Sequence, residues 1–152
     1  MIKKIISGGQ TGADIGGLKA AVILGLPTGG TMPNGWITLD EPKPEYAELY
    51  GMVECPRKGY PARTEANVIN SDGTIRFARN FKSAGEKCTL ACIKWFNRPY
   101  FDVNIDKPPS VEEFKNWIVE KNVAILNVAG NSEETAKGIE EFVIHYLIKA
   151  LG

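Results

Sequence analysis

The stretch Met1-Ile2-Lys3-Lys4-Ile5-Ile6-Ser7-Gly8-Gly9-Gln10-Thr11-Gly12-Ala13-Asp14 predicts the fold class of this chain. Its apolar, β-branched run from Ile2 to Ile6 is typical of a strand that is buried on both faces of a parallel sheet. The glycines break that strand, and apolar residues at helical spacing then follow from Ala13 to Leu24, with a stop signal at Gly25. A buried strand, a glycine turn and a helix form the first half of a βαβ unit.

The same alternation continues to the end of the chain and predicts one domain over residues 1–152. Because parallel strands need crossover connections, we expect a Rossmann-like, three-layer α/β/α domain with an open, mostly parallel sheet of five to six strands. Capping boxes are expected at Thr11–Asp14 and Ser110–Glu113, and Thr64 is expected to cap a short helix. Further strands are predicted at 26–28, 51–54, 74–78, 100–103 and 123–128, and further helices at 63–68, 83–96, 110–121 and over the apolar stripe that ends at Ala150.

The proline-rich segment Pro33–Pro61 interrupts this pattern. Apart from the strand-like piece Gly51–Glu54, it has no periodicity, and a long irregular segment in a compact domain is more often a functional loop than an accident. We therefore predict that it lies over a ligand site. Its aromatic residues, chiefly Trp36, Tyr46 and Tyr60, are candidates to pack on a flat ring.

Composition and charge limit the classes of partner. Lys+Arg and Asp+Glu both number 18, so a cationic field for nucleic acid and polybasic membrane anchors are both absent. The N-terminal apolar run is too short for a signal peptide, and no stretch approaches a membrane span. Three cysteines without a secretion signal indicate reduced thiols. We expect a cytoplasmic protein with no nucleic-acid and no membrane partner.

Histidine and aromatic residues narrow the chemistry further. The only histidine, His145, lies on the last predicted helix and far in sequence from every glycine turn. This disfavours zinc chemistry and histidine-activated nucleophiles, and we predict neither catalytic nor metal-ligating residues. The oligomeric state stays open: a homo-oligomer that pairs through helix faces is one alternative, with Phe114 and Trp117 as candidate contacts.

Ligands of open parallel sheets bind outside the carboxyl ends of the strands. Five segments are expected there: 7–14, 29–36, 54–64, 79–86 and 128–132. The first, fourth and fifth combine glycine with a helix start, where unpaired amides and a partial positive charge favour an anion. The first turn lacks both the GxGxxG spacing and the lysine of a Walker loop. Two interpretations of it remain, an anion receptor made of main-chain amides or a tight turn with capping side chains.

The blocks Ser7–Asp14, Gly29-Gly30, Arg63–Thr74 and Asn127–Gly130 resemble the putative molybdenum carrier family. That family belongs to a Rossmann-like set that includes the LOG-type nucleotide phosphoribohydrolases. The resemblance implies a Rossmann-like fold and a small anionic ligand, either molybdenum cofactor (molybdopterin), molybdate or another phosphate- or oxyanion-bearing molecule. The ligand-binding residues that it implies, with Arg63 added as a phosphate clamp, are Gly8, Gly9, Gln10, Thr11, Gly12, Asp14, Gly30, Arg63, Thr64, Asn67, Asp72, Gly85 and Gly130.

The chain departs from the family pattern at several of these blocks. Ile15 stands where arginine is usual, Asn131-Ser132 stand where Pro-Arg is usual, and the basic residue that is usual near Trp36 is missing. Ala84-Gly85-Glu86 replaces a Gly-Gly-Thr-like stretch. Fewer arginines and an added carboxylate make a strongly anionic ligand less favourable.

Two functions follow from the resemblance. One is a carrier that binds its ligand without transforming it. The other is a LOG-like N-glycosidic hydrolase in which a carboxylate (Asp14, Glu54, Glu65 or Glu86) assists cleavage of a nucleotide. The expected Gly-Gly-x-Gly-Thr-x-x-Glu block of the hydrolases is missing, which favours binding over catalysis.

Overall fold

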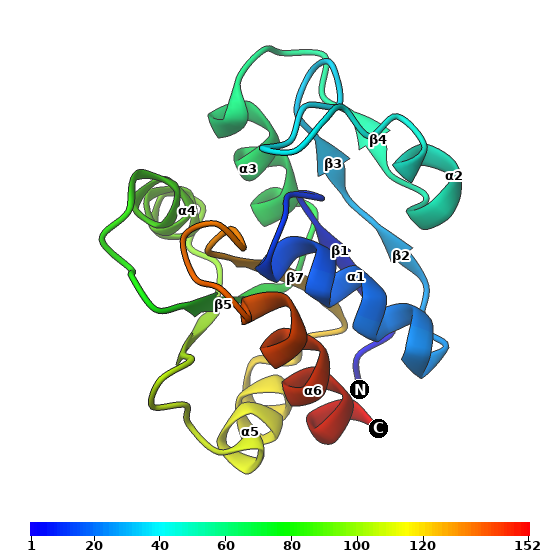
Figure 1. The fold of residues 1–152 in the computed structure, drawn as a ribbon. Helices are drawn as coiled ribbons and strands as arrows, with labels where there is room; N and C mark the ends of the chain where they lie inside the picture. The colour runs from blue at the N-terminus through cyan, green and yellow to red at the C-terminus, as the bar shows by residue number, and fades with distance from the viewer.

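A computed structural model describes all residues from 1 to 152 and shows one open sheet covered by helices (Figure 1). The sheet has five parallel strands in the order β2-β1-β7-β5-β6, and two further strands, β3 and β4, form a small parallel sheet of their own. The strands are β1 (Lys4–Ser7), β2 (Thr28–Gly29), β3 (Thr31–Met32), β4 (Val53–Glu54), β5 (Gly73–Ala78), β6 (Tyr100–Asn104) and β7 (Ile125–Gly130). The helices are α1 (Ala13–Leu24), α2 (Tyr46–Tyr50), α3 (Tyr60–Ile69), α4 (Ala84–Trp95), α5 (Val111–Lys121) and α6 (Ile139–Leu151).

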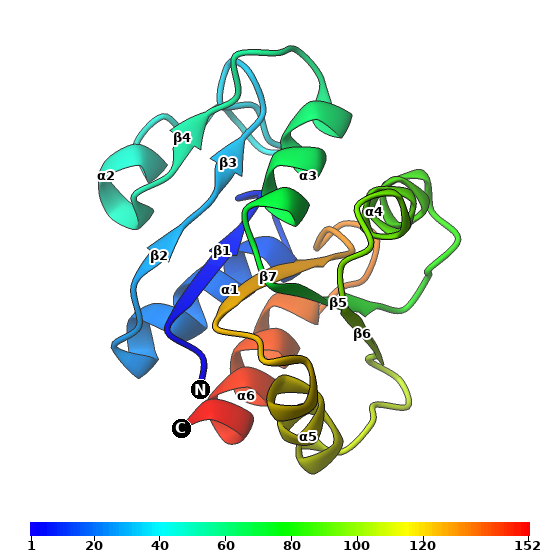
Figure 2. The same ribbon diagram turned by 180° about the vertical axis from the view of Figure 1, so that it is seen from behind.

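The helices form two layers, one on each face of the sheet (Figures 1 and 2). Helix α6 packs against both α1 and α5 in one layer, and α3 packs against α4 in the other. This division follows from right-handed crossovers, because β1–α1–β2 and β5–α4–β6 run outward in opposite directions from the middle of the sheet. The predicted Rossmann-like three-layer fold is confirmed, with five strands in the sheet.

The strand order creates the place for a ligand. Strand β1 connects outward to β2, β5 connects outward to β6, and β7 lies between β1 and β5. The helices that follow β1 and β5 therefore lie on opposite faces, and a crevice opens where the carboxyl ends of β1, β7 and β5 meet.

The main core fills the space between the sheet and the layer of α5 and α6. Phe77 of β5 packs edge-on against Tyr146 of α6, with 5.5 Å between the ring centroids. Phe114 and Trp117 of α5 are buried in the same core. They are therefore structural, and the proposed role of these two side chains as subunit contacts is wrong.

The segment 33–61 is more ordered than the sequence predicts. It contains α2 and β4, and it packs on α1 through a second core of Ile15, Leu18, Met32 and Met52. Three aromatic side chains of this segment pack against the second core, namely Trp36, Tyr46 and Tyr50. Two of the three predicted ring-binding residues thus face the core of this small subdomain.

Two predicted helix starts also differ from the structure. Gly12, and not Thr11, is the N-cap of α1, and α3 begins at Tyr60, which leaves Thr64 inside the helix. In both cases a glycine with a positive φ is the N-cap: Gly12 directly follows Thr11, and Gly59 precedes Thr64 by five residues. The box at Ser110 and Glu113 is confirmed. No helix is long and apolar enough to span a membrane.

Candidate ligand-binding site

A cavity of about 450 Å³ opens at the carboxyl edge of the sheet. It lies between the ends of β1 and β7, the start of α4 and the first turns of α3. Leu39, Tyr60 and Pro61 give it an apolar wall, and most of the remaining lining is polar or glycine. The other lining residues are Gln10, Asp14, Arg63, Thr64, Ser83, Ala84, Gly85, Glu86, Cys88, Thr89, Ala129, Gly130, Asn131, Ser132 and Thr135.

The turn after β1 does not offer its amides freely to a ligand. The Gly9 amide donates to Ser7 Oγ at 3.2 Å, and the Gln10 amide donates to Asp14 Oδ2 at 3.3 Å. The Ala13 amide donates to the carbonyl of Asn131 at 3.1 Å. Two of the amides predicted to bind an anion, those of Gly9 and Gln10, are therefore bonded within the protein, and the Asp14 carboxylate accepts from one of them.

Asp14 is buried in this turn, with 4% of its surface exposed. Burial raises the pKa of its carboxyl to about 6, although the guanidinium of Arg63 and the amide of Gln10 lower it. Asp14 Oδ2 lies 3.7 Å from Arg63 Nη1. Asp14 is thus a buried carboxyl with a raised pKa in the lining of the cavity.

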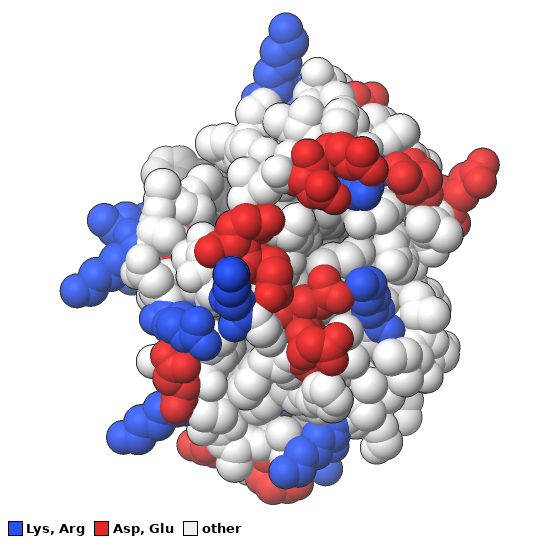
Figure 3. Space-filling model, viewed as in Figure 1, with Lys and Arg blue, Asp and Glu red and all other residues white.

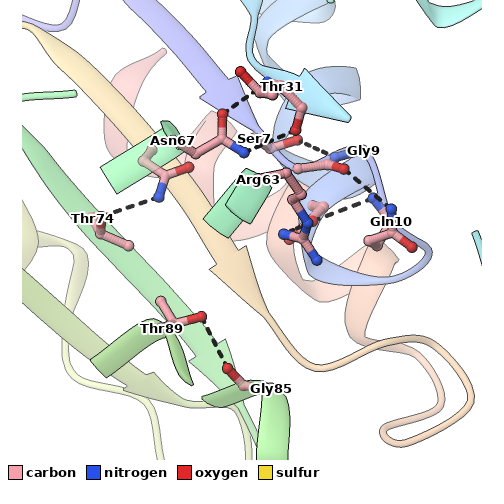
Figure 4. Close-up of polar contacts among 12 residues, drawn as sticks. Ser7, Gly9, Gln10, Thr31, Arg63, Asn67, Thr74, Gly85 and Thr89 are labelled. Atoms are coloured by element: carbon pink, nitrogen blue, oxygen red, sulfur yellow. Dashed lines mark hydrogen bonds and ion pairs between the residues drawn. The ribbon is translucent and has the colours of Figure 1, made fainter. Parts of the chain in front are cut away.

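Arg63 is the one cationic side chain that lines the cavity. Figure 4 shows it reaching from its helix toward the turn that holds Gly9 and Gln10. Its guanidinium lies over the Tyr60 ring, 5.5 Å from the centroid, and its Nε is buried without a hydrogen-bond partner. The long ion pair with Asp14 and the unpaired Nε leave Arg63 with donor capacity to spare.

Glu86 is a second buried carboxylate in the cavity, with 4% of its surface exposed. It stands in the first turn of α4, whose N-cap is Ser83. Its Oε2 accepts from Ser83 Oγ at 3.1 Å and from Asn131 Nδ2 at 3.0 Å. Burial raises the pKa of the Glu86 carboxyl, and these hydrogen bonds and nearby arginines oppose that rise.

Asn131 holds the cavity floor together. Its Oδ1 accepts from the amides of Arg79 and Asn80, and its Nδ2 donates to the Asn80 carbonyl and to Glu86. Its main chain bonds Phe77 at the end of β5 and Ala13 at the start of α1. The side chain and main chain of Asn131 thus hold together four elements: the ends of β5 and β7 and the starts of α1 and α4.

The structure brings six of the predicted ligand residues to the cavity and places the others elsewhere. Gly8 lies just behind the lining, since a Cβ there would stand 2.1 Å from Arg63 Nη1. Gly9 faces Met32 and Met52 of the second core, and Gly30 packs against the main chain of Ser7. The six that line the cavity are Gln10, Asp14, Arg63, Thr64, Gly85 and Gly130.

Four further predicted residues have structural contacts. Thr11 donates to Glu134, and Gly12 lies against the main chain of residues 131–133. Asn67 accepts from the Thr31 amide at 2.8 Å and donates to the Thr31 carbonyl at 3.1 Å, which ties α3 to β3 (Figure 4). Asp72 lies at the opposite edge of the sheet, where it accepts from the amides of Ala124 and Ile125, and is not part of the cavity.

Of the four carboxylates considered for hydrolysis, only Asp14 and Glu86 line the cavity. Glu54 accepts from the Gly35 amide, and Glu65 pairs with Arg57. Asn131 lines the cavity but was not among the predicted ligand-binding residues. Its position directly after Gly130, at the carboxyl end of a predicted strand, was a signal for it.

Comparison with known proteins defines the family. The model of the circularly permutated YpsA SLOG family matches residues 5–151. A crystal structure of a protein from Syntrophus aciditrophicus SB, named putative molybdenum carrier protein, is 32% identical to this chain with a TM-score of 0.90, over 99% of this chain and 96% of the other. No curated protein matches the chain.

The chain belongs to the circularly permutated YpsA SLOG family. The resemblance to molybdenum carrier proteins, and through them to the LOG-related set, is thereby confirmed.

Proposed function

We propose that this member of the family is a binding protein that carries a small ligand with a flat ring and one anionic group. A pterin phosphate, which is the organic part of the molybdenum cofactor without its metal-binding dithiolene, is the simplest ligand of this kind, and the solved relative is named putative molybdenum carrier protein. The cavity of about 450 Å³ is of a size that is usual for small-molecule sites, which measure roughly 300–1,000 Å³.

Arg63 is the observation that carries this proposal. It is the only cation in the lining, its Nε has no partner, and Asp14 stands 3.7 Å from its Nη1, beyond hydrogen-bond distance. An oxyanion that approaches the cavity gains charge-assisted hydrogen bonds from this guanidinium. The ring of the ligand then lies against Tyr60, Pro61 and Leu39, of which Leu39 is 61% exposed and gains most from being covered.

The charge around the cavity suits a ligand with a single anionic group. The lining holds one arginine and two carboxylates. Figure 3 shows Asp and Glu side chains gathered near the middle of the face that α1 and α6 form, with Lys and Arg scattered around them. Such a field gives a polyanion no long-range attraction.

Titration calorimetry of matched variants tests this function. Arg63→Gln removes the charge, and Arg57→Gln is the control, because Arg57 is exposed and pairs with Glu65 outside the cavity. The probes are molybdate, tungstate, a pterin phosphate and a nucleoside monophosphate. We expect the wild type and Arg57→Gln to bind at least one probe equally, and Arg63→Gln to bind it about 10-fold or more weakly. Equal affinity of all three proteins, or no binding of any probe, would overturn the proposal.

A LOG-like N-glycosidic hydrolase is the second candidate, and the two buried carboxylates favour it. Asp14 and Glu86 line the same cavity, and burial raises the pKa of both. Two carboxyls with raised pKa values in one site are candidates for a general acid and a general base. Chromatography that tracks free base from nucleoside monophosphates tests it: turnover that Asp14→Asn abolishes would establish hydrolysis, and no release would leave the carrier.

A further inference from the structure

Glu86 and Glu113 stand in the same local sequence motif but make different contacts. Ser83–Glu86 and Ser110–Glu113 both have the Ser-x-x-Glu spacing of a capping box. In α5 the box is closed, since Glu113 Oε2 accepts from the Ser110 amide at 2.7 Å, and Glu113 is exposed. In α4 the Ser83 amide is not bonded to Glu86, whose carboxylate turns to Asn131 and is buried.

The turn toward Asn131 leaves one carboxylate oxygen free. Both hydrogen bonds of the Glu86 side chain go to Oε2, and Oε1 accepts none from the protein. This oxygen is not among the buried atoms that lack a partner, so it is open to the cavity, where a donor of a ligand can reach it. Capping α4 therefore does not by itself account for the position of Glu86.

The cations near Glu86 are not free to neutralise it. The Arg76 guanidinium donates to Asp102 at 2.8 and 2.7 Å and to the Glu86 carbonyl at 3.0 Å, and it does not line the cavity. Arg63 has Asp14 as its nearest carboxylate. A second anionic group at the start of α4 would thus meet a Glu86 charge that Arg76 and Arg63 offset only in part, because both arginines are engaged with other carboxylates.

We propose that Glu86 decides which ligands the cavity accepts, by binding an N–H or O–H donor of the ligand at the first turn of α4 and by excluding a second anionic group from that position. Asn131 is the positioning residue that holds Glu86 in this orientation. Gly85 leaves the approach open, because a Cβ there would meet no atom within 4 Å. The inference rests on the proposed function, since it assigns the anion to Arg63 and the donor to Glu86.

The donor has two sources in the ligands under discussion, the hydroxyls of a ribose and the amino group of a purine or pterin ring. Three nucleotides separate them: guanosine monophosphate, inosine monophosphate, which lacks the ring amino group, and 2′,3′-dideoxyguanosine monophosphate, which lacks the diol. Each is titrated calorimetrically into wild type, Glu86→Gln and the matched control Glu113→Gln. Molybdate and inorganic phosphate serve as probes without a carbon-bound donor.

We expect wild type and Glu113→Gln to lose about 10-fold or more in affinity for one of the two deficient nucleotides. Glu86→Gln should lose this discrimination and should bind molybdate or phosphate at least 10-fold more tightly than wild type does. Thermal melting checks that Glu86→Gln is folded, and Glu86→Ser repeats the test if it is not. Arg63-dependent binding with unchanged discrimination and unchanged oxyanion affinity in the Glu86 variants would overturn this inference alone. No binding by wild type would overturn the proposed function as well.

Discussion

Asn131 Nδ2 lies 3.0 Å from Glu86 Oε2, and this contact joins the loop after β7 to the first turn of α4 across the cavity floor. Glu86 keeps its buried position because Asn131 supplies a donor that is itself held by the Asn80 carbonyl. The shape of the cavity and the orientation of its second carboxylate therefore depend on one amide side chain.

Replacing Asn131 with alanine should destabilise the whole domain. The change leaves the buried Glu86 carboxylate with one donor fewer and the amides of Arg79 and Asn80 without their acceptor. We expect a loss of about 3 kcal/mol in the free energy of unfolding. Urea denaturation measures it, with Asn70→Ala as the control because Asn70 is exposed and has no side-chain hydrogen bond. Equal midpoints for the two variants would show that Asn131 does not hold the floor.

Asp14 should make stability depend on pH. Its pKa is about 6 in the folded protein, against an ordinary value of 3.8. The folded state then binds more protons than the unfolded state between these values, so the contribution of Asp14 is fully present below pH 4 and is lost as the pH rises through 6. Relative to Asp14→Asn, the wild type should lose about 2 kcal/mol of stability between pH 4 and pH 7. A constant difference between the two proteins over this range would contradict the burial of the charge.

The same carboxyl should titrate differently when Arg63 is changed. The Arg63 guanidinium lowers the pKa of Asp14, so Arg63→Gln should raise it above 6. Carbon-detected NMR of the Asp14 carboxyl measures both midpoints. A midpoint that does not move, or that falls, would mean that the two groups are not coupled in solution.

Gly85 and Gly130 both line the cavity but should respond to alanine in opposite ways. At Gly130 the φ is +150° and a Cβ would stand 1.9 Å from the Phe77 carbonyl, so Gly130→Ala should destabilise the domain by roughly 3 kcal/mol or more. At Gly85 a Cβ meets no atom, and Gly85→Ala should keep or slightly raise the melting temperature because alanine favours a helix. It should nevertheless weaken ligand binding, because its methyl group enters the cavity. Thermal melting and calorimetry on both variants check this pair of outcomes.

Asn67→Ala should loosen the contact between α3 and β3. The side chain bonds both the amide and the carbonyl of Thr31, and all of these groups are buried. Two unpaired backbone groups should cost about 2–4 kcal/mol. Hydrogen exchange localises the effect: faster exchange of the Thr31 amide with little change in β5 is expected, and uniform acceleration throughout the chain would argue against a local contact.

The fold could be predicted where a segment carries its own periodicity. The strands near Thr74–Ala78 and Tyr100–Val103 and the helices near 83–96 and 110–121 are found where apolar spacing and serine caps indicate them. The prediction that segment 33–61 is irregular was wrong, because contacts with residues distant in the sequence order this segment. Met52 is buried in one core with Ile15 and Leu18 of α1, and the half-buried Trp36 packs against that core; no local pattern shows these contacts.

The site was predictable at the level of the sheet edge and not at the level of single groups. The rule that ligands bind at the carboxyl ends of the strands predicted that Gln10, Arg63, Gly85 and Gly130 lie near one another, and all four line one cavity. Sequence alone did not show that the Asp14 carboxylate returns to its own turn and accepts from the Gln10 amide. The role of Asn131 was equally hidden, because it arises only when three loops that are distant in sequence meet.

The central claim is that a small anionic ligand meets Arg63 in the cavity at the carboxyl edge of the sheet. Titrating ¹⁵N-labelled protein with a pterin phosphate and, separately, a nucleoside monophosphate tests this claim most directly, because the Arg63 side-chain Nε–H signal and every amide are observed together. We predict that the largest shifts occur at Arg63 Nε and at the amides of Gly85 and Gly130. An unchanged Arg63 signal at saturating ligand, or shifts that centre on the apolar groove beside Met1, Leu24 and Ile118, would contradict it.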